Sequence, residues 1–427
     1  MEGLITFSIM IIAILTSVPI AFAMIAVSLF AYIIFAHMPA GVVAQNMFYN
    51  IQSYSYSAIP YFILAGNVMA RGGIAKQLID IAEAFVGFFP SGMAIAVVVG
   101  CALFGTITGS DVATVAAIGG IMFPVLTSRG WPKPFVAGII GSSALLGMLI
   151  PPTIPGIIYA LMAEVSVMKV FLSGVLPGII IVIFFSVYIS FMGKKMIPGL
   201  KMQRPNVLKM LRALKNGWAP LGVPVIIFGG IFGGIFTVTE AAAVAAAYAL
   251  FLELLIHRGL KLRDIPGLLI ETGMTTSICL FLVSAAMVLG RFLTLEQIPQ
   301  MWADEIFSVV HSKWIFMLVV NLFLFVTGCL VDIVTGIVVL VPVFKPLYIK
   351  FGLNEIYFAS VFLLNMYIGY LTPPVGINLF VVSAMFGVSY IDCVKAYLPF
   401  IFLMSIALIL VILFPWLSIW LPNLLVR

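Results

Sequence analysis

GMLIPPTIPGIIYALMAEVS, residues 147–166, is an apolar segment interrupted by two adjacent prolines, and it decides the fold. A second segment, GYLTPPVGINLFVVSAMFGVS at residues 369–389, has its first glycine and its proline pair at the same spacing. A proline removes a backbone donor and clashes with the preceding turn, so each pair must break a helix. We therefore predict two broken helices of one design, over about residues 135–165 and 356–388.

The repetition extends beyond the proline pairs. In each half, one fixed distance leads from the second proline of the pair to a further Leu-Pro, which ends at Pro177 and at Pro399. Upstream, GSDVATVAAIGGIMFP at residues 109–124 resembles GCLVDIVTGIVVLVP at residues 328–342. Matched prolines and glycines arise from composition less easily than matched leucines. The sequence therefore predicts two structural repeats, as in many secondary transporters, and we expect them to be inverted.

The composition is that of a membrane protein over the whole chain. Of its 427 residues, 63% are hydrophobic and 8% are charged, and the mean hydropathy is +1.25. A spanning helix needs about 20 apolar residues, so the length allows on the order of 11 to 14 crossing or re-entrant segments. The predicted fold class is an all-α polytopic membrane protein in the lipid bilayer, with no room for a soluble domain.

Positive charge is concentrated in residues 193–217, a stretch that contains no acidic residue. The positive-inside rule places such a loop in the cytoplasm, and topology explains its charge better than nucleic-acid binding does. A second basic cluster at residues 258–263 belongs on the same side, so residues 218–256 between them are expected to cross twice as a helical pair. The predicted repeat halves are residues 1–217 and 218–427, the second closing with a final helix over about 392–421.

Each half also has an apolar segment interrupted by small polar residues, which we interpret as the tip of a re-entrant hairpin. The two hairpins are predicted over about residues 92–127 and 312–350. Carbonyls freed by a helix break cannot stay bare in hydrocarbon and need a donor or a cation. The half-helix after each break presents unpaired amides, which favour an anion. We expect two cation sites, suited to Na⁺, with a substrate site between them.

Asp111 and Asp332 are the most specific candidates, because ionisable groups at membrane depth are costly and usually functional. Each is either a cation ligand or the N-cap of the outgoing hairpin arm. Both interpretations are open for Asp111, whereas ligation is favoured for Asp332. Arg291 follows an apolar run, and it either marks the membrane boundary or meets a substrate carboxylate. Glu240 is expected to serve the start of its own helix.

The chain lacks the residue patterns of an enzyme. Its four cysteines are scattered through apolar segments, and its three histidines sit near segment ends rather than together. No paired-aspartate metal motif occurs, and no serine has a plausible histidine partner. We therefore predict no catalysis and no cofactor, with Na⁺ as the coupling ion.

Several motifs resemble the large membrane subunit of tripartite ATP-independent periplasmic (TRAP) transporters, over nearly the whole chain. They are IPYFILAGNVMARGGIA at 59–75, FGTITGSDVATVAAIG at 104–119, LIPPTIPGIIYA at 149–160, FTVTEAAAVAA at 236–246 and LTPPVGINLFV at 371–381. The resemblance implies a secondary carrier of the bacterial inner membrane, driven by a sodium gradient and moving as an elevator. It also implies two partners, a smaller membrane subunit and a soluble periplasmic protein that delivers the substrate.

Carried over to this sequence, the resemblance implies one sodium site in each half. The first comprises Gly105, Gly109, Ser110, Gly147, Ile150 and Pro151, and the second Gly328, Asp332, Thr335, Gly369, Thr372 and Pro373. Candidates for substrate contact are Thr108, Asp111, Pro152, Thr153, Arg291 and Pro374. Asp111 and Thr153 depart from the family pattern, in which serine is common at both places. Both replacements carry oxygen, so cation binding is retained while the charge of the first site is open.

Three other functions remain open from the sequence. A self-sufficient sodium-coupled carrier for dicarboxylates or citrate would share the hairpins and the duplication but need no partners. An intramembrane enzyme is disfavoured by its missing motifs, and a channel because two matched broken-helix sites favour occluded binding. The substrate is open among small organic anions, including C4-dicarboxylates, keto acids and acidic sugars such as sialic acid.

Overall fold

The structure is a computed structural model that describes residues 2–16, 18–197, 199–200, 202 and 204–426. All regular elements within these ranges are helices. Seven helices in the described part are long and apolar enough to cross a membrane, and the bent pair Lys133–Leu149 and Ile154–Ala163 is an eighth candidate. Lys201, part of the predicted basic loop, lies outside the described residues.

The first half of the chain begins with scaffold helices and continues into a hairpin and a broken helix. Its helices are α1 (Glu2–Leu15), α2 (Ile20–Ile34), α3 (Gly41–Asn50), α4 (Ala58–Arg71), α5 (Ile74–Val86), α6 (Gly92–Thr108), α7 (Asp111–Thr114), α8 (Gly120–Ser128), α9 (Lys133–Ala144), α10 (Leu146–Leu149), α11 (Ile154–Ala163), α12 (Val167–Met196) and α13 (Val207–Asn216). A π-helical turn, Val115–Gly119, joins α7 to α8. The hairpin is therefore α6 to α8, and the broken helix is α9 to α11.

The second half follows the same order. Its helices are α14 (Trp218–Phe232), α15 (Val238–Phe251), α16 (Ile265–Leu295), α17 (Ile298–Val309), α18 (Lys313–Leu330), α19 (Ile333–Lys350), α20 (Glu355–Tyr370), α21 (Ile377–Phe386), α22 (Tyr390–Leu413) and α23 (Trp416–Leu425). Here α18 and α19 form the hairpin, and α20 and α21 form the broken helix. The α14–α15 pair occupies the segment predicted to cross twice.

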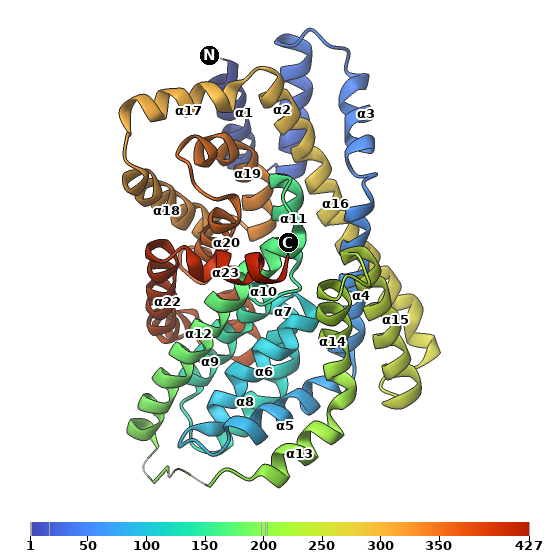
Figure 1. Cartoon of the computed structure of the whole chain (residues 1–427), viewed down its shortest axis with the longest axis vertical. Coiled ribbons are helices and arrows are strands. Elements are labelled where there is room, and N and C mark those ends of the chain that lie inside the picture. Colours follow the sequence, from blue (N-terminus) through green and yellow to red (C-terminus); the bar gives the residue numbers. More distant parts are fainter. Residues whose placement is uncertain (1, 17, 198, 201, 203, 427) are drawn as a thin grey trace.

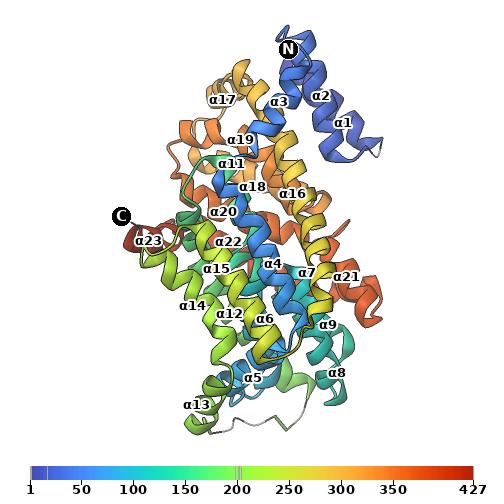
Figure 2. The ribbon, with the colours of Figure 1, turned by 90° about the vertical axis from the view of Figure 1, so that its right-hand side faces the viewer.

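The two hairpins enter the molecule from opposite ends. Figure 1 shows α5 and α8, at the base of the first hairpin, beside α13 at one end of the elongated molecule. α17, which leads into the second hairpin, lies at the other end in both Figure 1 and Figure 2. The two repeats are therefore inverted, as expected from their sequence. The hairpin tips and the helix breaks lie between these ends.

The last part of the chain differs from the expectation of one final helix over about 392–421. The structure has two helices there, because α22 ends at Leu413 and α23 begins at Trp416. Pro415, between them, lacks the amide donor that a continuous helix would need, and the chain turns at this point. We predicted a single long helix from the apolar composition, and composition does not indicate where a helix ends at a turn.

Small side chains hold the scaffold helices close together. α15 packs along α4, and its alanines at the contact are fully buried, including Ala241, Ala245 and Ala249. The start of α15 is fixed by a capping box, in which Thr237 and Glu240 exchange hydrogen bonds. The predicted role of Glu240 at its helix start is thus confirmed.

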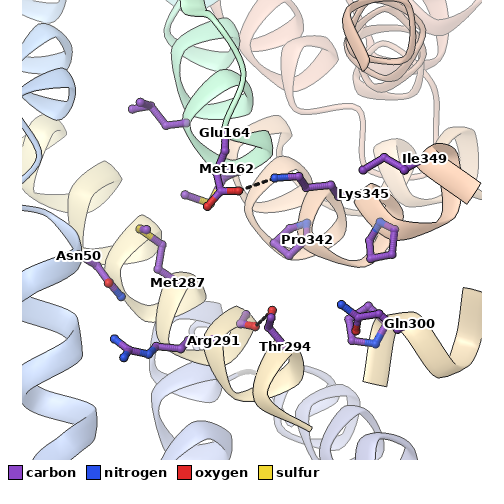
Figure 3. Close-up of a pocket in the computed structure, with 14 residues that line it drawn as sticks. Asn50, Met162, Glu164, Met287, Arg291, Thr294, Gln300, Pro342, Lys345 and Ile349 are labelled. Atoms are coloured by element: carbon purple, nitrogen blue, oxygen red, sulfur yellow. Dashed lines mark hydrogen bonds and ion pairs between the residues drawn. The ribbon is translucent and has the colours of Figure 1, made fainter. Parts of the chain in front are cut away.

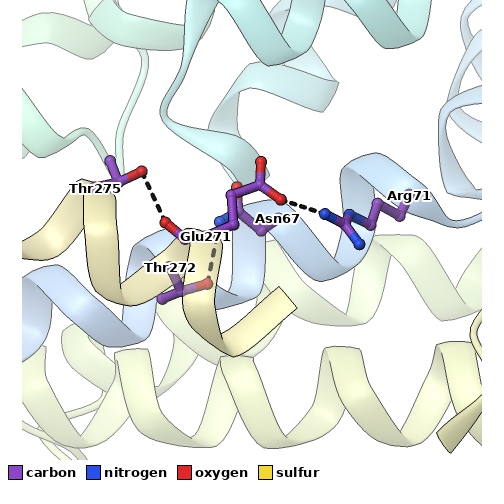
Figure 4. A network of polar contacts seen from close by, with 5 residues as sticks. All are labelled: Asn67, Arg71, Glu271, Thr272 and Thr275. Carbon is purple, nitrogen blue, oxygen red and sulfur yellow. Dashed lines mark hydrogen bonds and ion pairs between the residues drawn. The ribbon is translucent and has the colours of Figure 1, made fainter. Parts of the chain in front are cut away.

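Polar contacts join α4 to α16 (Figure 4). Asn67 Nδ2 donates to the Thr272 hydroxyl at 3.1 Å, and Arg71 forms an ion pair with Glu271. These contacts connect the scaffold helices of one repeat with those of the other. Arg71 is therefore part of the junction between the repeats.

Candidate ion and substrate site

The tip of the first hairpin lies between α6 and α7. α6 ends at Thr108, and Gly109 adopts the left-handed conformation with φ 59°, which glycine reaches without steric cost. The Ser110 hydroxyl then accepts a hydrogen bond from the Ala113 amide at 3.3 Å and caps α7. The small polar residues of the tip thus end one helix, reverse the chain and start the next.

Two glycines let the first hairpin contact the first broken helix through bare backbone. A Cβ atom added to Gly105 would lie 1.9 Å from Gly147 Cα, and one added to Gly147 would lie 2.3 Å from Gly105 Cα. No side chain fits between α6 and α10 at this point. A Cβ on Gly109 would lie 3.5 Å from the Pro152 carbonyl oxygen, so the turn of the hairpin faces the proline break.

The first break separates α10 from α11 and is enclosed by protein. Pro151, Pro152 and Thr153 are buried, and Ile150 is half-buried. The Thr153 hydroxyl accepts a hydrogen bond from the Gly156 amide at 3.1 Å and caps α11. Thr153, a candidate for substrate contact, therefore already satisfies an amide of its own half-helix.

Asp111 does not cap a helix, because Ser110 occupies the N-cap position of α7. Its carboxylate accepts a hydrogen bond from Asn378 Nδ2 at 3.0 Å, and Asn378 Oδ1 accepts one from the Tyr397 hydroxyl at 2.7 Å. Asp111 is 4% exposed, and Asn378 and Tyr397 are fully buried. No described basic side chain forms a salt bridge with Asp111. A buried carboxylate in this position needs a cation or a proton.

This chain of hydrogen bonds crosses between the repeats. Asn378 lies in the first turn of α21, after the second break, and Tyr397 lies on α22. Gly141 on α9 makes room for the tyrosine, since a Cβ there would lie 1.6 Å from the Tyr397 hydroxyl. Neither Asn378 nor Tyr397 was predicted from the sequence as part of this site. The one available signal was an asparagine close after a proline break, inside an apolar helix.

The tip of the second hairpin is built differently. Asp332 is the N-cap of α19, where its carboxylate accepts a hydrogen bond from the Thr335 amide at 3.0 Å and another from the Thr335 hydroxyl. The capping interpretation of Asp332 is therefore confirmed, and ligation stays a prediction. Because the Thr335 hydroxyl donates to Asp332, its lone pairs are free to accept a cation.

Backbone contact again joins the second hairpin to its broken helix. A Cβ added to Gly328 would lie 3.1 Å from Gly369 Cα, and one added to Gly369 would lie 2.6 Å from Gly328 Cα. The Val375 amide, within the break, donates to the Cys329 carbonyl at 3.3 Å. The contact is looser than that between Gly105 and Gly147, but its geometry is the same.

The second break is partly exposed, whereas the first is mostly buried. Thr372 and Pro373 are half-buried and Pro374 is exposed. The Thr372 hydroxyl donates to the Ile368 carbonyl at 2.8 Å, which keeps its lone pairs available. Gly376 precedes α21 with φ 52° and provides no side chain to cap it. The first amides of α21 therefore lack the side-chain acceptor that Thr153 gives to α11.

Arg291 lies apart from the other substrate candidates. It lines a cavity of about 530 Å³ between α16, α17, α19 and the end of α11 (Figure 3), together with Glu164 and Lys345, which form an ion pair. Its guanidinium donates to Asn46 on α3 at 2.8 Å. The residues around this cavity include none of the hairpin-tip or break residues. The structure thus separates Arg291 from the hairpin tips and the breaks, and its contact with a substrate stays a prediction.

The donors available to a cation are oxygens. No group of three or more His, Cys, Asp or Glu side chains in the described part of the chain could hold a metal ion. The candidate sites offer backbone carbonyls, hydroxyls and one carboxylate each, a hard oxygen set that suits alkali and alkaline-earth cations rather than zinc or copper. The residues present therefore fit Na⁺ as transported cargo.

Two inverted repeats, each with a hairpin tip against a broken helix, define the chain as a secondary transporter. The chain belongs to the family described as "Tripartite ATP-independent periplasmic transporter, DctM component", whose model matches residues 7–417. As a member of a family of transporter permeases, it is not an enzyme. The TRAP resemblance seen in the sequence motifs is thereby confirmed.

Comparison with known proteins agrees with this assignment. The chain is 39% identical over 381 residues to the C4-dicarboxylate TRAP transporter large permease protein DctM of Pseudomonas aeruginosa, covering 89% of each. It is 33% identical to the ectoine TRAP transporter large permease protein TeaC of Halomonas elongata, covering 90% of each. The crystal structure of the Alcanivorax borkumensis YdaH transporter has the same fold, with a TM-score of 0.60 at 13% identity over 87% of this chain and 88% of that one.

Proposed function

We propose that the chain is the translocating subunit of a sodium-coupled TRAP transporter that imports small organic anions. The observation that carries the proposal is the repeated contact of a hairpin tip with a broken helix, through Gly105 and Gly147 in one repeat and Gly328 and Gly369 in the other. Each contact brings the backbone of a hairpin arm directly against the backbone of a broken helix. Such duplicated broken-helix sites bind ions and substrate in secondary transporters.

Sodium coupling is supported by the two carboxylates. Asp111 is buried without a basic partner in the described part of the chain, and a bound Na⁺ would offset its charge. Asp332 and the hydroxyls of Thr335 and Thr372 supply a second set of oxygens beside the other break. We assign the two sodium sites to the residue sets expected from the sequence, with Asp111 added to the first.

An anionic substrate is supported by the second break, where the first amides of α21 lack a side-chain cap beside the exposed Pro374. Arg291 and Lys345 line a cavity, and we propose this cavity as an entrance for anions. Two of the helices that line it, α17 and α19, lie at the end of the molecule away from α13 (Figure 1). A carboxylate substrate agrees with the relative named for C4-dicarboxylates. Because another relative is named for ectoine, a substrate screen has to include that compound.

The partners and the motion belong to the same proposal. A small membrane subunit would complete the transporter in the bacterial inner membrane, and a periplasmic binding protein would deliver the substrate. The basic loop, residues 193–217, would face the cytoplasm by the positive-inside rule. Hairpins and broken helices would move together as an elevator against the scaffold formed by α2, α4, α15 and α16.

Uptake into proteoliposomes tests the proposal directly. The complete transporter is reconstituted, with its binding protein loaded with succinate, a sugar acid or ectoine, and uptake is measured with an inward gradient of Na⁺ or of K⁺. We expect accumulation of one acid only with Na⁺ and only with the binding protein present. Uptake that proceeds without the binding protein would instead indicate a self-sufficient dicarboxylate carrier.

A further inference from the structure

A second cavity, also of about 530 Å³, lies at the base of the first hairpin. Its walls are the turn between α5 and α6, the end of α8 and the described residues Gly199, Leu200 and Arg204 between α12 and α13. Figure 1 shows α5, α8 and α13 together at this end of the molecule. The cavity lies where the membrane spans end, and it shares no residue with the hairpin tips or the breaks.

The cavity carries an excess of positive charge. Arg129, Arg204 and Lys209 line it, against one acid, Glu83. Lys209 Nζ lies 3.0 Å from Glu83 Oε1, so these two charges offset each other and tie α13 to α5. Neither arginine forms a salt bridge within the described residues. Two guanidinium groups are therefore left for an anion, and arginine binds phosphate oxygens through paired hydrogen bonds.

An apolar groove adjoins the charged cavity. It has a volume of about 330 Å³ and runs along α6 and α12, and Phe89 lines both spaces. Its wall on α12 is part of an exposed apolar stripe, with Ile183 53% and Val187 64% exposed. In a membrane protein such a stripe faces acyl chains. A polar space for a phosphate thus opens directly beside an apolar space for a hydrocarbon chain.

We propose that these two spaces form a binding site for an anionic phospholipid. The phosphate lies between Arg129 and Arg204, and one acyl chain lies along the groove between α6 and α12. The site spans the base of the moving hairpin and the linker that joins the repeats, so a bound lipid would connect the two. Free phosphate has the same headgroup chemistry, but only a lipid uses the groove as well.

The test measures lipid binding to the purified, delipidated transporter complex by native mass spectrometry. Phosphatidylglycerol is titrated onto the natural protein and onto the double variant Arg129→Gln/Arg204→Gln. Each basic residue near an anionic lipid surface contributes about fivefold in affinity, so we expect binding to weaken about 25-fold in the double variant. Arg212→Gln/Lys215→Gln removes equal charge from α13 outside the cavity, and it should leave the affinity within about twofold.

Three further measurements test whether the site binds a lipid. Arg129→Lys/Arg204→Lys keeps the charge but loses the paired hydrogen bonds, so it should bind more tightly than the Gln variant and more weakly than the natural protein. Inorganic phosphate in millimolar excess should not displace the lipid, and displacement would make the site one for free phosphate. Equal binding by the two Gln variants would overturn the proposal. So would a complete complex that excludes lipid here because its small subunit covers the groove.

Discussion

The two broken helices share a backbone design, but protein encloses the first and leaves the second open. Pro151, Pro152 and Thr153 are buried, whereas Pro374 is exposed. The first half-helix is capped by its own threonine, and the second has only Gly376 at its start. The difference indicates that the repeats share the backbone geometry of the break but not its exposure. The second break is therefore the more accessible to a substrate.

The two aspartates differ in the same way. Asp332 caps α19, and its structural counterpart in the first hairpin is Ser110, which caps α7. Asp111 stands one residue further on, and its carboxylate reaches Asn378 in the other repeat. The polar chemistry of the two sites is therefore unequal, although the helices that carry it match in order and approximate length. Substitutions at the two sites should therefore have unequal effects.

The largest expected effect is at the glycine contacts. Gly105→Ala places a Cβ 1.9 Å from Gly147 Cα, and we expect a loss of about 3 kcal/mol in stability and no transport. Gly328→Ala meets its partner at 3.1 Å and should cost about 1 kcal/mol. Gly100→Ala, on the same helix as Gly105, is the control, because its nearest neighbour is a side-chain atom at 3.5 Å. Thermal unfolding in detergent measures the stability of the three variants. Equal unfolding temperatures for Gly105→Ala and Gly100→Ala would contradict a close contact between Gly105 and Gly147.

A smaller effect is expected at the network that closes the first site. Tyr397→Phe leaves Asn378 Oδ1 buried without its donor, which should cost about 2 kcal/mol. The carboxylate of Asp332 in the second site bonds the neighbouring Thr335 instead, so this loss belongs to the first site. Tyr188→Phe is the control, because that ring packs against the neighbouring Phe135 and Phe400 with no hydrogen bond from its hydroxyl in the described structure. If both variants unfold at the same temperature, the network does not stabilise the protein.

The cap of the second hairpin should have a smaller effect still. Asp332→Ala removes the acceptor for the Thr335 amide and should cost about 1 kcal/mol. Asp332→Asn retains one acceptor and should lose less. If Asp332 is also a sodium ligand, both variants will need more Na⁺ for half-maximal uptake. Unchanged sodium dependence in Asp332→Ala and in Thr335→Ala would mean that the second site is misplaced.

The smallest effect is expected at the start of α11. Thr153→Ala removes the cap from the Gly156 amide and should lower stability by about 0.5 to 1 kcal/mol. Thr153→Ser keeps the hydroxyl and should unfold within a degree of the natural protein. Transport rates should follow stability in both variants, because the hydroxyl serves its own helix. If Thr153→Ala alone needs a higher substrate concentration for half-maximal uptake, Thr153 contacts the substrate.

The order of helices, hairpins and breaks was predictable from the sequence. Prolines, glycines and the lengths of apolar segments determine such features locally. The hairpins, the proline breaks and their inverted repetition follow from such signals. The network around Asp111 was not predictable, since Asn378 and Tyr397 lie far along the chain and approach Asp111 only through the packing of two repeats. The cavity that Arg291 lines was not predictable either, because a position after an apolar run does not indicate which cavity a side chain lines.

A sodium site in each repeat can be tested by a sodium titration of thermal stability at constant ionic strength, with K⁺ as the replacement ion. We expect Na⁺ to raise the unfolding temperature, with a dependence on Na⁺ concentration steeper than one site would give. Asp111→Asn and Asp332→Asn should each reduce the rise and make the curve shallower. Equal stabilisation by Na⁺ and K⁺, or curves that both variants leave unchanged, would contradict this expectation.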